Sequence, residues 1–255
     1  MLWLGVLAGM FIALAGATLE IGSATLTGSV AKIVGGMVFP GGLAMVIISG
    51  SELFTGNTLI IIPVLEKQAT WIGMLKNWLF VYIGNFIGSV LIAALLVYGH
   101  TLVKVVPDGA AGVFAIHTAV SKVNLTFVDA FFRGILCNFL VCIAVWMAYA
   151  SKDVAGKIVG LFFPIMFFIL CGYEHSVANM YFISSGLFAS GIDTYAKAAA
   201  DAFPKDAIAS LTWGAFFVKN LLPVTLGNIV GGSVLVGLLV LGPPLWTVVA
   251  TLLTR

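Results

Sequence analysis

Long apolar stretches separated by short polar segments run along the whole chain. A helix needs about 20 apolar residues to cross the hydrocarbon core of a bilayer. Six stretches reach that length, and they cover residues 2–27, 30–65, 71–98, 125–150, 159–190 and 211–241. The pattern predicts an all-α membrane protein with six transmembrane helices and both termini on the same side. An apolar tail follows Pro243 and Pro244 to Arg255.

Two of the six predicted spans are interrupted by glycine and polar residues. The second is broken at Phe39-Pro-Gly-Gly42 and again at Ser49-Gly-Ser-Glu52, and the fifth is broken at Gly172. We therefore expect each of these spans to consist of two half-helices joined by non-helical chain. Residues 100–124 and 191–210 carry much of the remaining charge, and we expect both segments to be loops.

The composition agrees with a membrane protein. Hydrophobic residues make up 61% of the chain and charged residues 9%, whereas soluble domains carry about 25% charged residues. A net charge of +2 without a basic run indicates no nucleic-acid partner. Lysine and arginine are shared almost equally between the two sides, so they do not orient the chain. The cysteines are predicted to be small buried hydrophobes rather than a disulfide framework: Cys137, Cys142 and Cys171.

Two patterns recur in the same order in the two halves of the chain. Gly50 to Asn57 and Gly172 to Asn179 both follow G-x-E-x-x-x-x-N. Residues 76–88 and 219–231 both follow K-N-x6-G-N-x2-G. Each half holds three spans, so the halves must enter the membrane in opposite directions. We expect one channel domain, residues 1–255, built from inverted repeats at about 1–105 and 124–255, as in channels and secondary transporters.

The paired breaks favour a pore for a small anion. A broken helix leaves free N–H groups and the positive end of a dipole at the start of its second half. Thr55 can add a hydroxyl donor, and His175 an imidazole that also exchanges protons near neutral pH. Apolar residues beside the breaks would form constrictions that resist hydrated ions: Leu43, Leu53 and Phe168, with Phe39 nearby.

The other polar residues at the breaks are expected to support the structure. Glu52 and Glu174 would accept hydrogen bonds from backbone N–H groups there, in the manner of a helix cap. Asn57 ends the first motif, and further asparagines are expected to tie helices together: Asn85, Asn138, Asn179 and Asn228. The glycines of the second pattern indicate close helix packing.

Catalytic and metal chemistry find little support in the sequence. The three histidines have no metal-ligand spacing. No nucleophile elbow, phosphate-binding loop or dinucleotide fingerprint has suitable flanks. We expect no enzymatic activity, no catalytic residue, no metal and no cofactor.

In five stretches of sequence the chain closely resembles the formate/nitrite transporter family. The matching stretches cover nearly the whole chain: Ser51-Glu-Leu-Phe-Thr-Gly-Asn57, Lys76-Asn-Trp78 through Gly84-Asn85, Gly134-Ile-Leu-Cys-Asn138, Gly172-Tyr-Glu-His-Ser-Val-Ala-Asn-Met180 and Pro223-Val-Thr-Leu-Gly-Asn228.

The resemblance implies a homopentamer in the cytoplasmic (inner) membrane, with cytoplasmic termini and a pore in each aquaporin-like protomer. It places His175 at the centre with Thr55 as its partner. Leu43 and Leu53 would form one constriction and Phe168 the other, and the loop after Phe39 would be a mobile gate. Lys122 and Asn138 match positions that tune the field around the histidine.

Two features depart from that family's pattern. Glu20 stands in the first span where the better-known formate channels have an uncharged residue. It is expected either at the pore mouth or at a contact between protomers. The family's cytoplasmic N-terminal helix is nearly absent, which leaves N-terminal gating open.

The leading hypothesis is a channel or proton-coupled carrier for small monovalent anions of weak acids, formate first. Nitrite or hydrosulfide is the alternative within the same family. A water or glycerol pore is the alternative from another class, but its paired Asn-Pro-Ala motifs are missing. Its arginine filter is missing too, because Arg133 and Arg255 are the only arginines. A membrane-embedded enzyme or a purely structural protein remains the last alternative.

Overall fold

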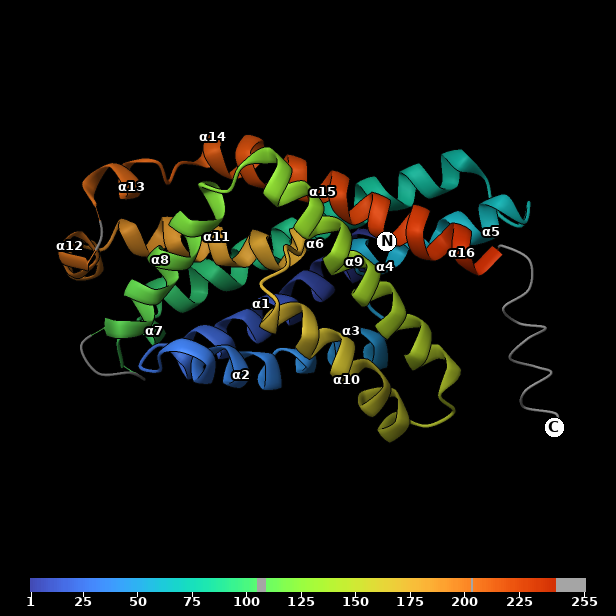
Figure 1. Ribbon diagram of the computed structural model, residues 1–255, viewed down its shortest axis with the longest axis horizontal. Helices are drawn as coiled ribbons and strands as arrows, with labels where there is room; N and C mark the ends of the chain where they lie inside the picture. Colours follow the sequence, from blue (N-terminus) through green and yellow to red (C-terminus); the bar gives the residue numbers. More distant parts are fainter. Residues whose placement is uncertain (105–108, 203, 242–255) are drawn as a thin grey trace.

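The computed structural model describes residues 1–104, 109–202 and 204–241, and this part of the chain is almost entirely helical (Figure 1). The predicted apolar tail after Pro243 and Pro244 lies outside the described residues. Among the described residues, five helical stretches are long and apolar enough to cross a membrane, at Leu2–Ser23, Gly28–Ser49, Trp71–Tyr98, Phe127–Ala150 and Trp213–Val240. The fifth predicted span is divided between two shorter helices.

The first half of the chain contains helices α1 to α7. Their bounds are α1 Leu2–Ser23, α2 Gly28–Val38, α3 Pro40–Ser49, α4 Phe54–Asn57, η1 Thr58–Ile60, α5 Ile61–Leu65, α6 Trp71–Tyr98 and α7 Thr101–Lys104. The second half contains α8 Ala110–Val123, α9 Phe127–Ala150, α10 Val154–Leu170, α11 Ser176–Ser190, α12 Asp193–Ala202, α13 Lys205–Ala209, α14 Trp213–Ala215, η3 Phe216–Leu221, α15 Leu222–Ile229, η4 Val230–Gly237 and α16 Leu238–Leu241.

The first predicted break of the second span is not a break. Phe39 has helical backbone angles, φ −62° and ψ −34°, and it joins α2 to α3. Pro40 occupies the first turn of α3, where its missing N–H costs no hydrogen bond. The expected loop after Phe39 is therefore helical. Only the second break, after Ser49, separates two helices.

The two segments expected to be loops also contain helices. Residues 110–123 form α8, whose small apolar residues recur at helical spacing and are buried, as at Ala111, Ala115 and Ala119. This stripe packs against α11, because a Cβ added to Gly186 would overlap Ala119. Residues 193–202 and 205–209 form α12 and α13. The charges in both segments obscured a helical pattern that was present in the sequence.

Glycines bring the long helices together, as the second repeated pattern predicts. A Cβ on Gly88 of α6 would overlap the carbonyl oxygen of Val6 in α1. A Cβ on Gly231 would overlap the carbonyl oxygen of Ile135 in α9 in the same way. Close backbone approach through small residues is how helices pack tightly in membranes. The same contact therefore joins the first and third spans of each half.

The sixth span departs from regular α-helix in two places. Residues 216–221 and 230–237 are π-helical, a form that often accompanies functional sites. Side chains from other spans bind the backbone near the second of these segments. Nδ2 of Asn138 donates to the carbonyl oxygen of Asn228 at 2.7 Å. Ser233 in turn donates from its hydroxyl to the carbonyl of Thr58 at 2.9 Å.

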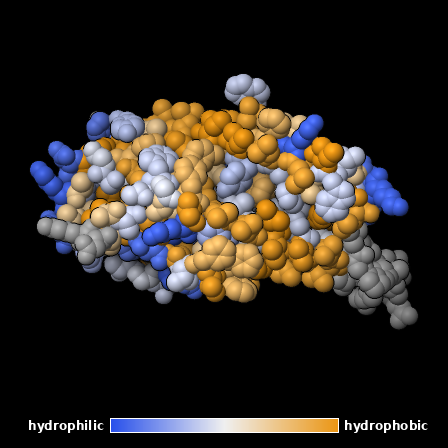
Figure 2. All heavy atoms as spheres, turned by 90° about the horizontal axis from the view of Figure 1, so that it is seen from above, coloured by the Kyte–Doolittle hydropathy of each residue, from blue (hydrophilic) through white to orange (hydrophobic). Residues whose placement is uncertain are grey.

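The outer surface suits a bilayer. Figure 2 shows hydrophobic residues covering most of the middle of one face, with the most hydrophilic residues gathered towards the two ends. Many of the large exposed side chains are apolar, including Trp3, Ile72 and Val218. A soluble protein rarely exposes so continuous an apolar surface. The fold is therefore that of a protein that crosses the membrane several times.

Candidate functional site

The two helix breaks adopt the same backbone conformation. Gly50 ends α3 at φ 71°, and Gly172 follows α10 at φ 68°. Positive φ values favour glycine because it has no Cβ. Three residues later, Leu53 has φ −108° and ψ 124°, and His175 has φ −109° and ψ 116°. The shared motif therefore encodes one backbone conformation, used once in each half.

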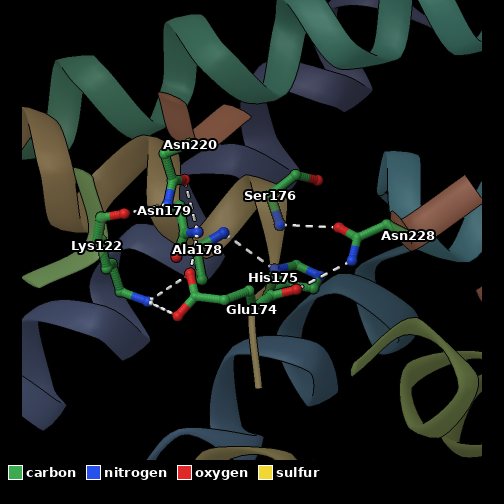
Figure 3. A network of polar contacts seen from close by, with 8 residues as sticks. All are labelled: Lys122, Glu174, His175, Ser176, Ala178, Asn179, Asn220 and Asn228. Atoms are coloured by element: carbon green, nitrogen blue, oxygen red, sulfur yellow. Dashed lines mark hydrogen bonds and ion pairs between the residues drawn. The ribbon is translucent and has the colours of Figure 1, made fainter. Parts of the chain in front are cut away.

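Each break is held by an asparagine from another span. Oδ1 of Asn85 accepts from the N–H of Phe54 at 2.9 Å, and its Nδ2 donates to the carbonyl of Glu52 at 3.0 Å. Asn228 forms the same pair of bonds with Ser176 and Glu174, at 2.9 and 3.0 Å (Figure 3). The backbone N–H groups at the breaks were expected to bond to the glutamates. The asparagines of the third and sixth spans bind them instead.

The glutamates bond to side chains. Oε2 of Glu52 accepts from Nδ2 of Asn57 at 3.1 Å and from Nδ2 of Asn77 at 2.6 Å. In the second half, Nδ2 of Asn179 donates to Glu174 at 2.6 Å and to Asn220 at 2.8 Å (Figure 3). The G-x-E-x-x-x-x-N motif thus places a carboxylate and an amide in contact across each break.

Lys122 gives the second break a cation. It lies in the last turn of α8, and its Nζ is 3.0 Å from both carboxylate oxygens of Glu174. The side chains are 15% and 6% exposed, respectively. A pair this shielded interacts more strongly than one on an open surface. Lys122 was expected in a loop, but it is fixed at the end of a helix.

His175 and Thr55 meet between the two breaks. Nε2 of His175 is 2.8 Å from Oγ1 of Thr55, and both side chains are buried. The N–H of Ala178 donates to Nδ1 of His175 at 3.0 Å, so Nδ1 accepts and carries no proton. The neutral ring then carries its proton on Nε2 and donates to Thr55. The hydroxyl proton of Thr55 is left to donate to a further group.

Fewer backbone N–H groups are free at the start of α11 than we expected from the helix break. Ser176 donates its N–H to Asn228, Ala178 to His175, and Asn179 to the carbonyl of His175 at 2.9 Å. Three of the first four N–H groups are therefore occupied. Donors for an anion at this point must come mainly from side chains, and Thr55 is positioned to supply one.

Two cavities are lined by residues of the two helix breaks, and His175 lines the first. The first has a volume of about 540 Å³, and the second about 360 Å³. Nine lining positions of the first recur in the second, each 122 residues earlier in the chain. The pairs are Val46 and Phe168, Ile47 and Ile169, Gly50 and Gly172, Ser51 and Tyr173, Glu52 and Glu174, Leu53 and His175, Gly56 and Ala178, Asn57 and Asn179, and Ile60 and Phe182.

The predicted constriction residues are found in the walls of these cavities. Phe168 and His175 line the first cavity, and Leu43 and Leu53 line the second. Phe39 lines neither cavity and packs edge to face on Phe168, with ring centroids 5.5 Å apart. The Phe168 ring in turn stacks on His175 at 5.9 Å. The structure thus brings the predicted pore residues into one cluster.

Asn138 binds the backbone of Thr55. Its Nδ2 donates to the carbonyl oxygen of Thr55 at 3.2 Å and to Oγ1 of Thr58 at 3.0 Å. Thr58 also donates to the Thr55 carbonyl at 2.6 Å, and Sγ of Cys142 lies 3.5 Å from it. Sequence reasoning missed Thr58 and Cys142. Cys142 follows Asn138 by four residues, which places both on the same face of α9.

Sequence reasoning also missed Phe182. It lines the first cavity and stacks on Phe39 with centroids 6.4 Å apart. The residue follows His175 by seven positions, which is two helical turns and therefore the same face of α11. That spacing could have identified it.

Glu20 lies neither at a pore mouth nor on the outer surface of the chain. Its side chain is 0% exposed and lines neither cavity. Oε2 accepts from the Tyr181 hydroxyl at 2.7 Å and from Ser185 at 3.3 Å. Both sequence-based expectations for Glu20 are therefore wrong, because the residue joins α1 to α11 inside the protomer.

Replacing Tyr181 by phenylalanine is expected to lower the melting temperature by about 2–10 °C in detergent. The change leaves the buried carboxyl group of Glu20 with Ser185 alone, and an unsatisfied buried polar group costs about 1–3 kcal/mol. Tyr149→Phe is the matched control because Tyr149 is 71% exposed. Equal melting temperatures for the two variants would show that the Glu20–Tyr181 bond does not stabilise the fold.

Known proteins are similar to this chain in sequence and fold over nearly its whole length. The family model described as formate/nitrite transporter matches residues 1–242. A probable formate transporter of Methanothermobacter thermautotrophicus is 39% identical over 253 residues, which covers 92% of this chain and 85% of the relative. The formate channel FocA of Haemophilus influenzae is 41% identical over 240 residues, covering 91% and 82%.

A solved structure described as a pentameric formate channel with formate bound superposes with a TM-score of 0.84 at 32% identity. The match covers 98% of this chain and 96% of that one. A family model over nearly the whole chain and relatives near 40% identity agree with the paired helix breaks and with the helical membrane fold. The chain belongs to the formate/nitrite transporter family and is a channel of that family.

Proposed function

We propose that this channel carries small monovalent anions of weak acids, with formate as the leading substrate. The observation that carries the proposal is the pair of cavities lined by equivalent residues of the two helix breaks, from which His175 and Thr55 meet. Relatives and a solved neighbour described as formate channels support formate. The protein acts as a transporter and not as an enzyme.

The assembly proposed is a homopentamer in the cytoplasmic membrane with both termini on the cytoplasmic side. The pentameric description of the solved neighbour supports the oligomer. Each protomer contains one channel domain, residues 1–255, whose inverted repeats divide at about 1–105 and 124–255. The matched hydrogen bonds of Asn85 and Asn228 support this division.

Permeation in this proposal depends on a few side chains. Lys122 attracts the anion into the first cavity, and Phe168 with Phe39 excludes larger hydrated ions by an apolar constriction. Leu43 and Leu53 form the apolar constriction that excludes larger hydrated ions at the second cavity. Between the constrictions the anion accepts a hydrogen bond from the Thr55 hydroxyl, which is held by His175. Glu52, Asn57, Glu174, Asn179 and Asn138 keep the breaks and Thr55 in place.

Proton coupling requires an additional step. The neutral His175 ring has its proton on Nε2 and its Nδ1 occupied by the Ala178 N–H. To donate a proton to formate, the ring must first gain one on Nδ1, and this breaks the contact with Ala178. The anion therefore either passes with hydrogen bonds alone or crosses as the neutral acid when His175 is protonated from the cavity.

Flux measurements in proteoliposomes test the function. Purified protein is expected to transport formate faster than protein-free liposomes and faster than chloride between pH 5 and 8. Nitrite, hydrosulfide and glycerol are measured in parallel, because nitrite and hydrosulfide are the alternative substrates and glycerol represents a neutral pore. Formate flux equal to that of protein-free liposomes would overturn the proposal, and faster nitrite or hydrosulfide flux would change the substrate.

A further inference from the structure

Phe182 occupies the cavity-facing side of α11. It follows His175 by two turns, and Ala178 and Asn179 lie between them on the same side. All four line the first cavity, and Phe182 is only 5% exposed. Its ring is therefore part of the wall along which an anion would approach His175.

The same ring lies beside the ammonium group of Lys122. Nζ of Lys122 is 5.5 Å from the centroid of Phe182 and 3.0 Å from both oxygens of Glu174. A cation within about 6 Å of a ring face is attracted by the ring quadrupole. The ammonium group is thus held between a carboxylate and an aromatic face, and Lys122 also lines the cavity.

A continuous series of ring contacts leads from Lys122 to the central histidine. Phe182 stacks on Phe39 at 6.4 Å, Phe39 contacts Phe168 at 5.5 Å, and Phe168 stacks on His175 at 5.9 Å. The position of the Phe182 ring is therefore fixed by the constriction itself. A charge held on this ring lies at the entrance to the narrow part.

The equivalent position in the first repeat distinguishes what the packing of this side chain requires from what the contact with a cation requires. The position equivalent to Phe182 in the first half is Ile60, which lines the second cavity. An aliphatic side chain therefore fills this place in the helix equally well. Only an aromatic ring provides a face for a cation, and the ring occurs in the half that contains Lys122.

We propose that Phe182 is a positioning residue that holds the Lys122 ammonium group at the aromatic constriction, where it lowers the anion concentration needed for transport. The proposal rests on the proposed function, since the readout is anion flux. Phe182 does not bind the anion itself. It acts through Lys122.

Fluorination of the ring tests the proposal at nearly constant size. Phenylalanine carrying one, two or three ring fluorines is incorporated at position 182, and formate flux is measured against formate concentration in proteoliposomes. Each fluorine weakens the ring quadrupole. The half-saturating formate concentration is expected to rise stepwise, by about three- to tenfold with three fluorines. The same series at Phe216 is the matched control, because Phe216 is fully buried among other aromatic rings and lines neither cavity.

A Lys122→Gln background completes the design. There the fluorine series at position 182 is expected to have no effect, because the cation is gone. A flat series in the unmodified background, or the same rise at Phe216 and Phe182, would overturn the positioning role. Failure of the proposed function is distinct, because the protein with ordinary phenylalanine would then give no flux above protein-free liposomes.

Discussion

Replacing His175 by asparagine is expected to lower formate flux about ten- to a hundredfold while the fold is kept. Asparagine is a favourable N-cap residue, so it can accept the Ala178 N–H in place of Nδ1. It loses the ring that reaches Thr55 at 2.8 Å and the stacking on Phe168. A hydrogen bond to a charged group contributes about 1.5–3 kcal/mol, and 1.4 kcal/mol is a factor of ten.

The measurement is formate flux in proteoliposomes from pH 5 to 8, with His100→Asn as the control. His100 is exposed and has φ 57°, a conformation that asparagine tolerates. The control is expected to match the unmodified protein in rate and pH profile. If His175→Asn also kept the flux rate and the pH profile of the unmodified protein, the proposed role of the histidine in the pore would be wrong.

Replacing Asn228 by leucine is expected to destabilise the protein by at least about 2 kcal/mol and to reduce the yield of folded channel. Asn228 bonds to the N–H of Ser176 and to the carbonyls of Glu174 and Gly134. Leucine has a similar size but leaves the N–H of Ser176 and the carbonyl of Glu174 without this partner, whereas the carbonyl of Gly134 lies within α9 and keeps its helical hydrogen bond. Each unsatisfied buried group costs about 1–3 kcal/mol.

Melting temperature and yield in detergent test this result. Asn85→Leu is expected to have a similar effect, because Asn85 makes the equivalent bonds to Phe54, Glu52 and Gly5. Asn124→Leu is the control, since Asn124 is exposed. If Asn228→Leu and Asn124→Leu melted at the same temperature, Asn228 would not hold the helix break.

The repeated motifs carried most of the fold prediction. Gly50 and Gly172 have positive φ values, a backbone conformation that favours glycine. The repeated glycine makes that requirement visible in the sequence. The false break at Phe39 arose because Pro40 and two glycines usually interrupt helices. Here the proline lies in the first turn of a helix, where it is tolerated. Local composition alone did not distinguish these cases.

The site was predicted less completely because its details depend on contacts between distant segments. The pairing of His175 with Thr55 spans 120 residues, and no local pattern shows which nitrogen faces the pore. Glu20 was expected at the pore mouth or at a contact between protomers, because a charge within a membrane span is costly. Its partner Tyr181 lies 161 residues away, so only the folded chain shows that hydrogen bonds to Oε2 of Glu20 offset part of this cost.

The central claim is that the anion passes between His175, Thr55 and the two constrictions of a single protomer. A high-resolution structure of the protein in formate tests it most directly. We expect density for the anion within hydrogen-bonding distance of the Thr55 hydroxyl, between Leu53 and Phe168. Density confined to the outer cavities, with none near Thr55 at saturating formate, would contradict the account.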